Sequence, residues 1–430
     1  MAVEYESLDR RTTASLSQPD QRSMSSAAMA HSGAASAAGS PGPRAEISNL
    51  ATSRIRAIAN AAMGRENIAA FWFGESDRPT PDFIREAAMA SLGRGETFYS
   101  HNLGLMALRE KIAGYLTTLH SSAVNADRIA VTGSGVSALM LSAQMLVSPG
   151  DRVVIVTPVW PNVTEIPKIL GAEVVRVPLS VVDGRWTLDI DRLSAALTPE
   201  TRALWLGSPN NPTGWTIPRN ELAAIFEHCR NLGIWVVTDD VYERLTYGDE
   251  AAPSLLPIAT PEDRLISVNS FSKAWSMTGW RIGWMVAPPP FIAELTKVIE
   301  YNTSCVPVFV QAGAVAALDA RNGETAVTEL RARLGQSRDL LLNRLRRHAA
   351  IEAPEADGAM YAFFRIADRT DDMALAQALL EDVGLGLAPG SAFGPEGEGW
   401  LRWCFAASPE KIEDGLDRLA RFLGRNEIKQ

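Results

Sequence analysis

Residues 267–284 read SVNSFSKAWSMTGWRIGW, and the interpretation of the whole chain starts from this stretch. Its first residues continue the apolar run of Leu265 and Ile266, which is typical of a buried strand, and Lys273 follows among serines. Lysine is scarce in this chain, where arginine supplies nearly every other positive charge. An amine in such a half-apolar pocket is desolvated, which lowers its pKa and makes it a nucleophile toward an aldehyde. The stretch therefore predicts imine chemistry at Lys273.

Two serines and an arginine in the same stretch indicate what the aldehyde carries. The hydroxyls of Ser270 and Ser272 and the guanidinium of Arg281 make a binding site for a phosphate dianion. A lysine imine beside a phosphate site describes pyridoxal phosphate, a cofactor whose ring stabilises carbanions. A serine-rich turn with one lysine is a weak motif by itself, so the rest of the chain has to support it.

Length and composition limit the classes of protein to consider. A chain of 430 residues is too long for one core, so we expect two domains that share a cleft. The net charge of -9 argues against a nucleic-acid partner. Cys229, Cys305 and Cys404 form no CxxC pair and are expected to be reduced, with neither a disulfide framework nor a metal site. Reduced cysteines predict a cytoplasmic protein. No apolar run reaches the roughly 18 residues of a membrane-spanning helix, so no membrane role is expected.

The chain divides by composition into four parts. The first is small, polar and rich in serine and alanine, a composition that cannot bury enough apolar surface to fold. The predicted divisions are a disordered tail at 1–43, the N-terminal part of a small domain at 44–80, a large cofactor-binding domain at 81–305, and the C-terminal small domain with connecting helices at 306–430.

Strand and helix patterns alternate through the large domain, which predicts an α/β fold with a mostly parallel seven-stranded sheet covered by helices on both faces. The expected strands are 128–132, 152–157, 173–177, 202–206, 234–238, 264–268 and 281–287. Before them, IAAFWF (68–73) is expected as a strand, with helices at 53–63, 81–92 and 105–119. After them, strands at 360–366 and 400–406 and helices to 320 and at 325–347, 372–382 and 408–423 make the small domain α+β. Ligands of such sheets lie beyond the carboxyl ends of the strands.

The first expected strand runs into TGSGVSAL, where Ser134 and Gly135 open a helix whose amides can bind a phosphate. The same letters fit the dinucleotide fingerprint GxGxxA, so a nicotinamide enzyme is a competing interpretation. That fingerprint requires an acidic residue about 20 residues further on, which binds a ribose hydroxyl of the dinucleotide. The next strand ends instead in Thr157 and Pro158, which weakens the dinucleotide interpretation.

Polar and aromatic residues follow three other strands. Trp160 could stack on a flat ring or fill the core, and Asn211, within a run of turn formers, offers an amide to a phenolate oxygen. Asp239 directly follows an apolar strand and could pair with a protonated pyridine nitrogen, or it could cap a helix. Tyr242 could donate to the same phenolate oxygen as Asn211.

From about residue 47 to the end, the chain resembles the class I and II aminotransferases of the aspartate aminotransferase type, which are fold type I pyridoxal-phosphate enzymes. The motifs that carry this resemblance stand in the family's order: Tyr99, SGV at 134–136, Trp160, NPTG at 211–214, Asp239 with Tyr242, SxSK at 270–273, Arg281, and Arg402 in LRWCFA.

The resemblance implies a role for each matching residue. Lys273 would form the internal aldimine and move the substrate proton, Asp239 would pair with the pyridine nitrogen, and Tyr242 and Asn211 would bond the ring oxygen. Trp160 would stack on the ring. The phosphate would lie among Ser134, Gly135, Val136, Ser270, Ser272 and Arg281, with Tyr99 reaching in from the second subunit of a homodimer. Substrate would meet Gly74, Trp160, Asn211 and Arg402, the last holding the α-carboxylate.

The resemblance implies an aminotransferase that moves the amino group of an L-amino acid to a 2-oxo acid, with 2-oxoglutarate expected, by a ping-pong mechanism. A C-S lyase or another eliminating or cyclising enzyme on the same scaffold is the alternative. A regulator that kept this fold would need a DNA-binding module, for which the tail has no helix-turn-helix pattern. Trp72, Trp160 and Trp215 suggest a bulky or aromatic substrate. The candidates for reading a distal carboxylate are Arg54, Arg56 and Arg78.

Overall fold

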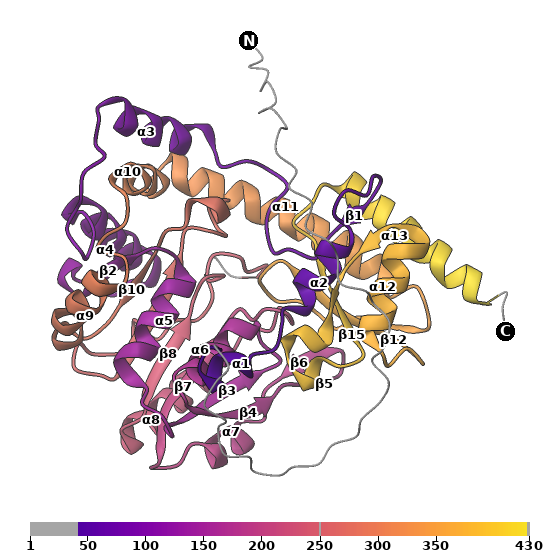
Figure 1. Cartoon of the computed structure of the whole chain (residues 1–430), viewed down its shortest axis with the longest axis horizontal. Coiled ribbons are helices and arrows are strands. Elements are labelled where there is room, and N and C mark those ends of the chain that lie inside the picture. Colours follow the sequence, from indigo (N-terminus) through magenta and orange to yellow (C-terminus); the bar gives the residue numbers. More distant parts are fainter. Residues whose placement is uncertain (1–41, 249–250, 428–430) are drawn as a thin grey trace. The chain divides into compact units, whose positions relative to one another are not determined.

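A seven-stranded sheet forms the centre of the larger part of the protein, as the computed structural model shows (Figure 1). The structure describes residues 42–248 and 251–427, so the predicted disordered tail lies almost entirely outside the described residues. In sheet order the strands are β2 (Ile129–Thr132), β10 (Gly283–Val286), β9 (Leu265–Ser270), β8 (Trp235–Asp239), β7 (Thr201–Gly207), β3 (Arg152–Thr157) and β4 (Glu173–Pro178). Strand β10 is antiparallel to both neighbours, and the other neighbouring pairs are parallel. The predicted α/β class is confirmed.

The sheet is buried on both faces, which is why its strands are almost continuously apolar. Successive residues of one strand belong to different cores: Val153 and Ile155 pack with α5, α6 and α9, whereas Val154 and Val156 pack in the larger core that includes α4, α7 and α8. This alternation follows from the two-residue repeat of a strand.

The described residues form thirteen α-helices, and those that were expected at stated ranges lie close to these ranges. They are α1 (Ala45–Ser48), α2 (Arg54–Ala61), α3 (Asp82–Gly93), α4 (Met106–His120), α5 (Gly135–Leu146), α6 (Pro161–Ile169), α7 (Ile190–Ala196), α8 (Arg219–Leu232), α9 (Pro289–Asn302), α10 (Val308–Ala317), α11 (Asn322–Leu345), α12 (Asp372–Val383) and α13 (Pro409–Glu427). Ordinary caps set several ends: Ser53 and Asp371 accept from backbone amides of the first turns of α2 and α12, and Gly233 ends α8 in the left-handed conformation.

The C-terminal part contains a second sheet of four strands, in the order β11 (Ile351–Glu352), β12 (Tyr361–Ile366), β15 (Trp400–Cys404) and β14 (Ala388–Pro389). Two smaller pairs are β1 (Ala69–Ala70) with β13 (Leu385–Gly386) and β5 (Ser180–Val182) with β6 (Arg185–Thr187). The β1–β13 pair joins the segment before Gly74 to the C-terminal part. Within the described residues, no helix is long and apolar enough to cross a membrane.

One expectation about local structure was wrong, and one helix was not expected. The segment IAAFWF forms only the two-residue strand β1, because after Phe71 the chain leaves the pairing with β13 and approaches Lys273 at Gly74. Helix α9, which covers one face of the large sheet, was not anticipated within 289–302. Two prolines open this helix, and proline is favourable in a first turn because its missing amide would have no partner there.

Candidate active site

A cavity of about 890 Å³ lies beyond the carboxyl ends of the parallel strands. Each of the strands β2, β3, β7, β8 and β9 sends the residues that follow it into the cavity wall. The predicted residues on that wall are Gly74, Gly135, Val136, Trp160, Asn211, Asp239, Tyr242, Ser270, Ser272, Lys273, Arg281 and Arg402. The wall therefore combines residues from the whole length of the described chain.

Lys273 lies in the turn after β9, and its Nζ donates a hydrogen bond to the carbonyl oxygen of Gly74. Burial lowers the pKa of Lys273 to about 8, and the positive charges of Arg402 and Arg281 act in the same direction. A substantial fraction of this amine is therefore unprotonated near pH 8, as a nucleophile requires.

Asp239 is the last residue of β8 and lines the cavity, whereas Asp240 points away from it. Burial raises the pKa of Asp239 to about 6, although the amide of Val241, which donates to its Oδ1 at 3.3 Å, opposes this effect. Asp240 instead accepts hydrogen bonds from the hydroxyls of Thr238 at 2.8 Å and Ser267 at 2.6 Å. Strand alternation thus selects Asp239 as the carboxylate that a ligand would meet.

One end of the cavity has the donors of an anion site. Ser270 Oγ and Ser272 Oγ lie 2.9 Å apart, and Arg281 is held at a left-handed φ of 54° beside them. Gly135 opens α5 so close to Ser270 that an added Cβ would lie 3.4 Å from the serine Cβ. Ser134 caps this helix by accepting from Ser137 N at 3.0 Å, but it does not reach the cavity wall.

Arg402 also lines the cavity and is held by several contacts. Its guanidinium lies 4.4 Å from the ring centroid of Tyr361 and 4.8 Å from that of Phe393. Its Nη1 donates to Asn211 Oδ1 at 2.9 Å and its Nη2 to the carbonyl of Trp72, whereas Nε has no partner within the described residues. The side chain is 2% exposed and forms no ion pair within the described residues, so its charge is available to an anionic ligand.

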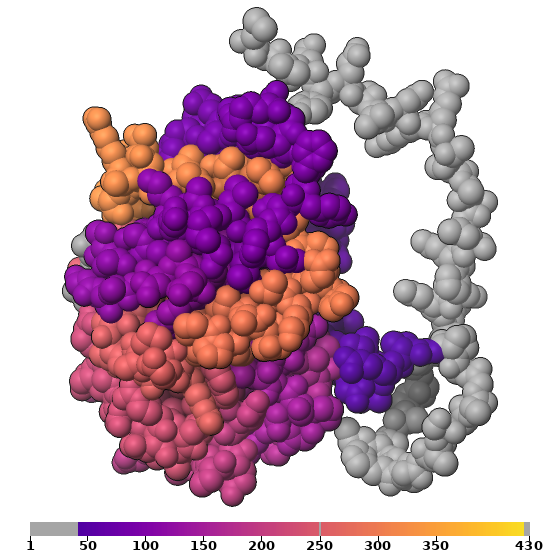
Figure 2. Space-filling model, turned by 90° about the vertical axis from the view of Figure 1, so that its left-hand side faces the viewer, coloured from indigo at the N-terminus to yellow at the C-terminus, as the bar shows by residue number. Residues whose placement is uncertain are grey.

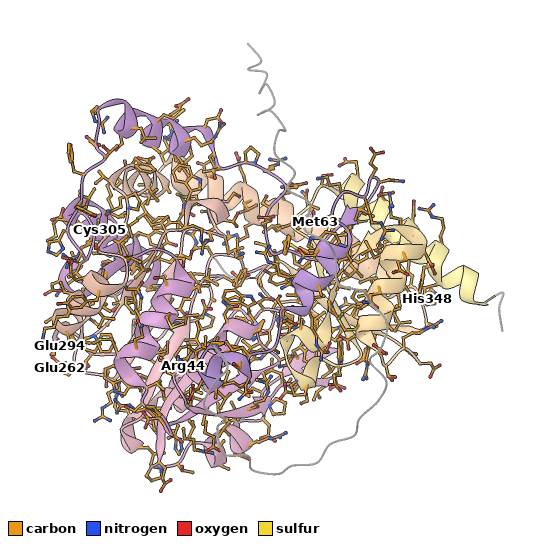
Figure 3. The ribbon with its side chains drawn as sticks, viewed as in Figure 1. Arg44, Met63, Glu262, Glu294, Cys305 and His348 are labelled. Carbon is orange, nitrogen blue, oxygen red and sulfur yellow. The ribbon has the colours of Figure 1, made fainter. Side chains whose placement is uncertain are left out.

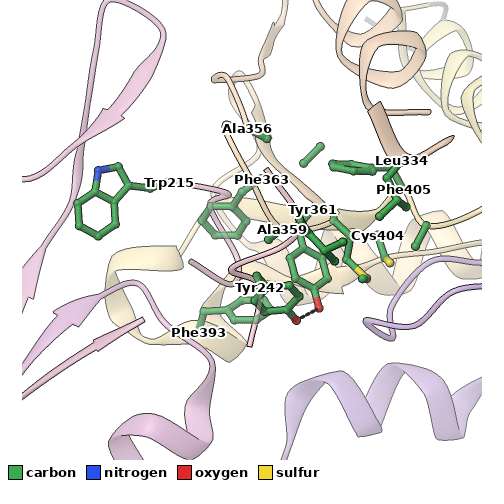
Figure 4. Packing of buried hydrophobic residues seen from close by; sticks show 14 of the residues in the cluster. Trp215, Tyr242, Leu334, Ala356, Ala359, Tyr361, Phe363, Phe393, Cys404 and Phe405 are labelled. Carbon is green, nitrogen blue, oxygen red and sulfur yellow. Dashed lines mark hydrogen bonds between the residues drawn. The ribbon is translucent and has the colours of Figure 1, made fainter. Parts of the chain in front are cut away.

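Tyr361 is a wall residue that the sequence did not reveal. Its hydroxyl lies 2.6 Å from the hydroxyl of Tyr242, as the dashed line in Figure 4 shows. No motif surrounds it, since YAFF in β12 has the composition of any buried strand. The signal that would have found it is the register of β12 against β15, which places it diagonal to Arg402.

Some predicted residues lie elsewhere. Tyr99 is 91% exposed and does not line the cavity. The expectation that Trp215 helps to line the substrate site was wrong, because Trp215 is buried in the core, away from Tyr242 in Figure 4. Arg54 and Arg56 line the cavity, and Arg78 lines a separate, shallower hollow.

The residues present fit pyridoxal phosphate. The donor set of Ser270, Ser272 and Arg281 suits a phosphate, and Asp239 suits a protonated ring nitrogen. Asn211 uses its oxygen to accept from Arg402, which leaves its amide nitrogen for an acceptor in the cavity. Lys273 is the one lysine besides Lys168 on the wall, and Lys168 is paired with Glu165 at 2.7 Å.

The fold, with its seven-stranded mixed sheet, matches the aspartate aminotransferase fold, fold type I. A Thermus thermophilus aspartate aminotransferase mutant superimposes with a TM-score of 0.83 and is 30% identical in sequence. The match covers 89% of this chain and 100% of the mutant's chain. Among curated relatives, Thermotoga maritima aspartate aminotransferase is 32% identical over 88% of this chain and 97% of its own length. Thermococcus litoralis aromatic-amino-acid aminotransferase 2 is 30% identical over 87% of this chain and 97% of its own length.

The family model for aminotransferase class I and II matches residues 68–419. The chain therefore belongs to the class I and II aminotransferase family, and it is an aminotransferase.

Proposed function

We propose that this protein binds pyridoxal phosphate covalently through Lys273 and moves the amino group of an L-amino acid to a 2-oxo acid, with 2-oxoglutarate as the acceptor, by a ping-pong mechanism. The observation that carries the proposal is the position of the Lys273 amine in one cavity with Asp239 and Arg402. This reaction needs three groups: a nucleophilic amine, a carboxylate that pairs with the ring nitrogen, and a guanidinium that binds the substrate carboxylate in a bidentate manner.

When bound, pyridoxal phosphate supplies an electron-withdrawing ring that stabilises negative charge at the substrate α carbon. The chain's own groups orient and protect this reaction. Asp239, half-buried at the end of β8, would keep its negative charge next to a ring nitrogen, because a neighbouring cation lowers the pKa of a carboxyl that burial has raised. Lys273, with a pKa lowered to about 8, would accept and return the substrate proton at Nζ.

Arg402 would bind the substrate α-carboxylate through the guanidinium edge that faces the cavity. Its position between two rings leaves it little rotational freedom, so little side-chain entropy is lost when a substrate binds. Trp160 lines the wall where a ring would stack, and Val136 offers no donor to a phosphate. Of the three candidate arginines, Arg54 and Arg56 line the same wall and would meet a distal carboxylate.

We further propose a homodimer in which Tyr99 contributes to the partner's phosphate site. Tyr99 is 91% exposed and its neighbour Phe98 is 83% exposed, although both are large aromatic side chains. Tyr301, at the end of α9, is also 91% exposed. Figure 2 shows the face formed by α3, α4, α9 and α10 from outside. Exposed aromatic side chains of this kind are typical of a surface that a second copy covers.

The segment that carries Tyr99 is held in place by the loop before α10. The amide of Ser100 donates to Cys305 Sγ at 3.3 Å, and Asn102 Nδ2 donates to the carbonyl of Ser304 at 3.0 Å. Figure 3 labels Cys305 on this side of the molecule. The aromatic side chains are therefore presented on an anchored backbone, which favours a defined interface. Light scattering of the purified protein, with Tyr99→Asp and Phe98→Asp as interface variants, tests the dimer.

The reaction is tested by an absorbance spectrum of the purified protein, followed by single L-amino acids added without an acceptor. We expect a visible band that some amino acids convert to a pyridoxamine band while their 2-oxo acids appear. Lys273→Ala removes the visible band, and Lys297→Ala, a surface lysine paired with Glu294, keeps it. Release of ammonia or a thiol without band conversion would mean an eliminating enzyme on the same scaffold. Absence of any band after the cofactor is added would refute the proposal.

A cytoplasmic location and the absence of nucleic-acid and membrane partners stay predictions from the sequence. Cys229, Cys305 and Cys404 are free thiols in the structure.

A further inference from the structure

We propose that Tyr361 is a positioning residue that acts on two residues of the active site: its hydroxyl orients Tyr242 and its ring supports Arg402. The inference rests on the proposed function, because it concerns how two of the proposed binding residues are held. Tyr361 lies in β12 of the four-stranded sheet, whereas Tyr242 follows β8 of the seven-stranded sheet.

The two tyrosine hydroxyls form an isolated pair. Their oxygens lie 2.6 Å apart, and their rings meet edge to face, with centroids 5.7 Å apart and planes at 78° (Figure 4). Burial raises the pKa of Tyr361 to about 12 despite the opposing charge of Arg402, and burial also raises the pKa of Tyr242. Both phenols are therefore protonated at neutral pH, and each has one hydrogen to donate.

The hydrogen bond between the two hydroxyls has a defined direction once Tyr242 donates its own hydrogen to a ligand in the cavity. Tyr242 then has only its oxygen left for Tyr361, so Tyr361 must donate to Tyr242. A hydrogen bond received at the phenol oxygen polarises the hydroxyl and strengthens the bond that it donates. Tyr361 thus strengthens the hydrogen bond from Tyr242 to the cofactor ring oxygen without touching that oxygen.

The ring of Tyr361 has a second role. Its centroid lies 4.4 Å from the Arg402 guanidinium, and the ring centroid of Phe393 lies 4.8 Å from the same guanidinium. Strands β12 and β15 pair so that Phe363 stands opposite Arg402 and Tyr361 opposite Cys404. Tyr361 is therefore the diagonal neighbour of Arg402 on the same face of the sheet, within reach of a long side chain. These two ring contacts restrict the rotation of the Arg402 guanidinium, which lines the cavity.

Close packing at Gly74 supports the same conclusion. A Cβ built on Gly74 would lie 1.8 Å from the Tyr361 hydroxyl oxygen. This position therefore requires glycine for the close approach of Tyr361, and the Gly74 carbonyl is the acceptor for Lys273. Tyr361 thus contacts three of the elements that surround the cofactor position.

A purely structural role would not need the hydroxyl. The side chain of Tyr361 is 1% exposed, and burying a phenol hydroxyl costs free energy unless it finds a partner. Phenylalanine would fill nearly the same volume without that cost, as Phe363 and Phe364 do in the same strand. The one hydrogen bond that the structure gives this hydroxyl is to Tyr242.

The test compares Tyr361→Phe, Tyr361→Leu and the control Tyr247→Phe in the cofactor-loaded protein. Tyr247 is a close match, since its hydroxyl donates to the Ala359 carbonyl at 2.5 Å and its ring lies 4.3 Å from the Arg338 guanidinium, but it does not line the cavity. The readouts are the pKa of the visible absorbance band, and kcat and KM for donor and acceptor.

We expect Tyr361→Phe to raise the pKa of the visible band by roughly half to one unit, because a weaker bond from Tyr242 destabilises negative charge on the ring oxygen. KM should change less than about twofold, since the ring under Arg402 remains. Tyr361→Leu should show the same shift and also raise both KM values about tenfold, because the ring contact is lost. Tyr247→Phe should leave the band and KM unchanged.

Each part of the inference can fail separately. An unshifted band in Tyr361→Phe overturns the role of the hydroxyl, and an unchanged KM in Tyr361→Leu overturns the role of the ring. Equal shifts in Tyr247→Phe would mean general loosening and overturn both. A wild-type protein without a band refutes the proposed function and this inference with it, whereas a normal wild-type band with unshifted variants refutes the inference alone.

Discussion

In the cofactor-free protein, the Lys273 amine should destabilise the fold, so Lys273→Met should raise stability at pH 7. The pKa of Lys273 is lowered by burial from 10.5 to about 8 in the folded state. The folded protein therefore binds this proton more weakly than the unfolded chain does. Stability falls as the pH drops from about 10.5 to about 8, and below pH 8 the full penalty remains.

The pKa difference sets an upper limit of about 3 kcal/mol on the gain from Lys273→Met at pH 7. Two features reduce it. Lys273 is only half-buried, so solvent screens part of the penalty, and its hydrogen bond to the Gly74 carbonyl is lost in the variant at a cost of about 1 kcal/mol. We expect a net gain of about 1–2 kcal/mol at pH 7, since methionine fills a similar volume.

Urea unfolding of cofactor-free wild type and variant at pH 7 and pH 10.5 measures the effect. The gain should be largest at pH 7 and should disappear at pH 10.5, where the lysine is neutral in the folded state. Lys297→Met, at a side chain that is 67% exposed, is the control and should show no pH-dependent difference. An equal gain at both pH values would assign it to apolar packing, and no gain at pH 7 would refute the reasoning.

Three further predictions concern other parts of the molecule. Arg402→Lys should raise KM for both substrates about 10- to 100-fold, since lysine cannot form the two-pronged contact; steady-state kinetics decide this. Gly283→Ala should lower the unfolding midpoint, because its Cβ would lie 2.6 Å from the Asn269 carbonyl oxygen, whereas Gly279→Ala, with no atom within 4 Å, should not. Burial lowers the pKa of His120, but the hydrogen bond and charge of Glu243 outweigh this and raise it. The stability from this pair is complete below about pH 6.5 and is lost as the pH rises through the raised value, so His120→Gln should remove that loss in melting curves between pH 6 and pH 8.

The large sheet was predictable because both of its faces are covered. A strand such as β3, RVVIVT, must be apolar at every position, and that pattern is visible without tertiary information. The residues that follow such strands were predictable for the same reason, since the carboxyl ends of parallel strands meet at one edge. Asp239 and Lys273 were placed at that edge by this reasoning, and both line the cavity.

Contacts between distant segments were not predictable. The sequence did not show that Asp240 would accept hydrogen bonds from Thr238 and Ser267, because the latter contact joins two different strands. It could not reveal Tyr361 either, since its partner Tyr242 lies 119 residues away and belongs to the other sheet. Trp215 was misplaced because a tryptophan after a run of turn formers has the same local sequence whether it faces the cavity or the core.

The hydrogen bonds of the site also join the parts of the fold. Lys273 bonds the Gly74 carbonyl, Arg402 bonds Asn211, and Tyr242 bonds Tyr361, so each pair links loops of the large sheet to the small sheet or to the segment before α3. These bonds use groups that are costly to bury, such as a half-buried amine and an arginine whose Nε has no partner in the described part of the chain. The costs are offset only when anionic ligands bind between the parts. A ligand that contacts both Lys273 and Arg402 should therefore stabilise the whole fold more than one that contacts either alone, because it relieves two penalties and bridges the two sheets.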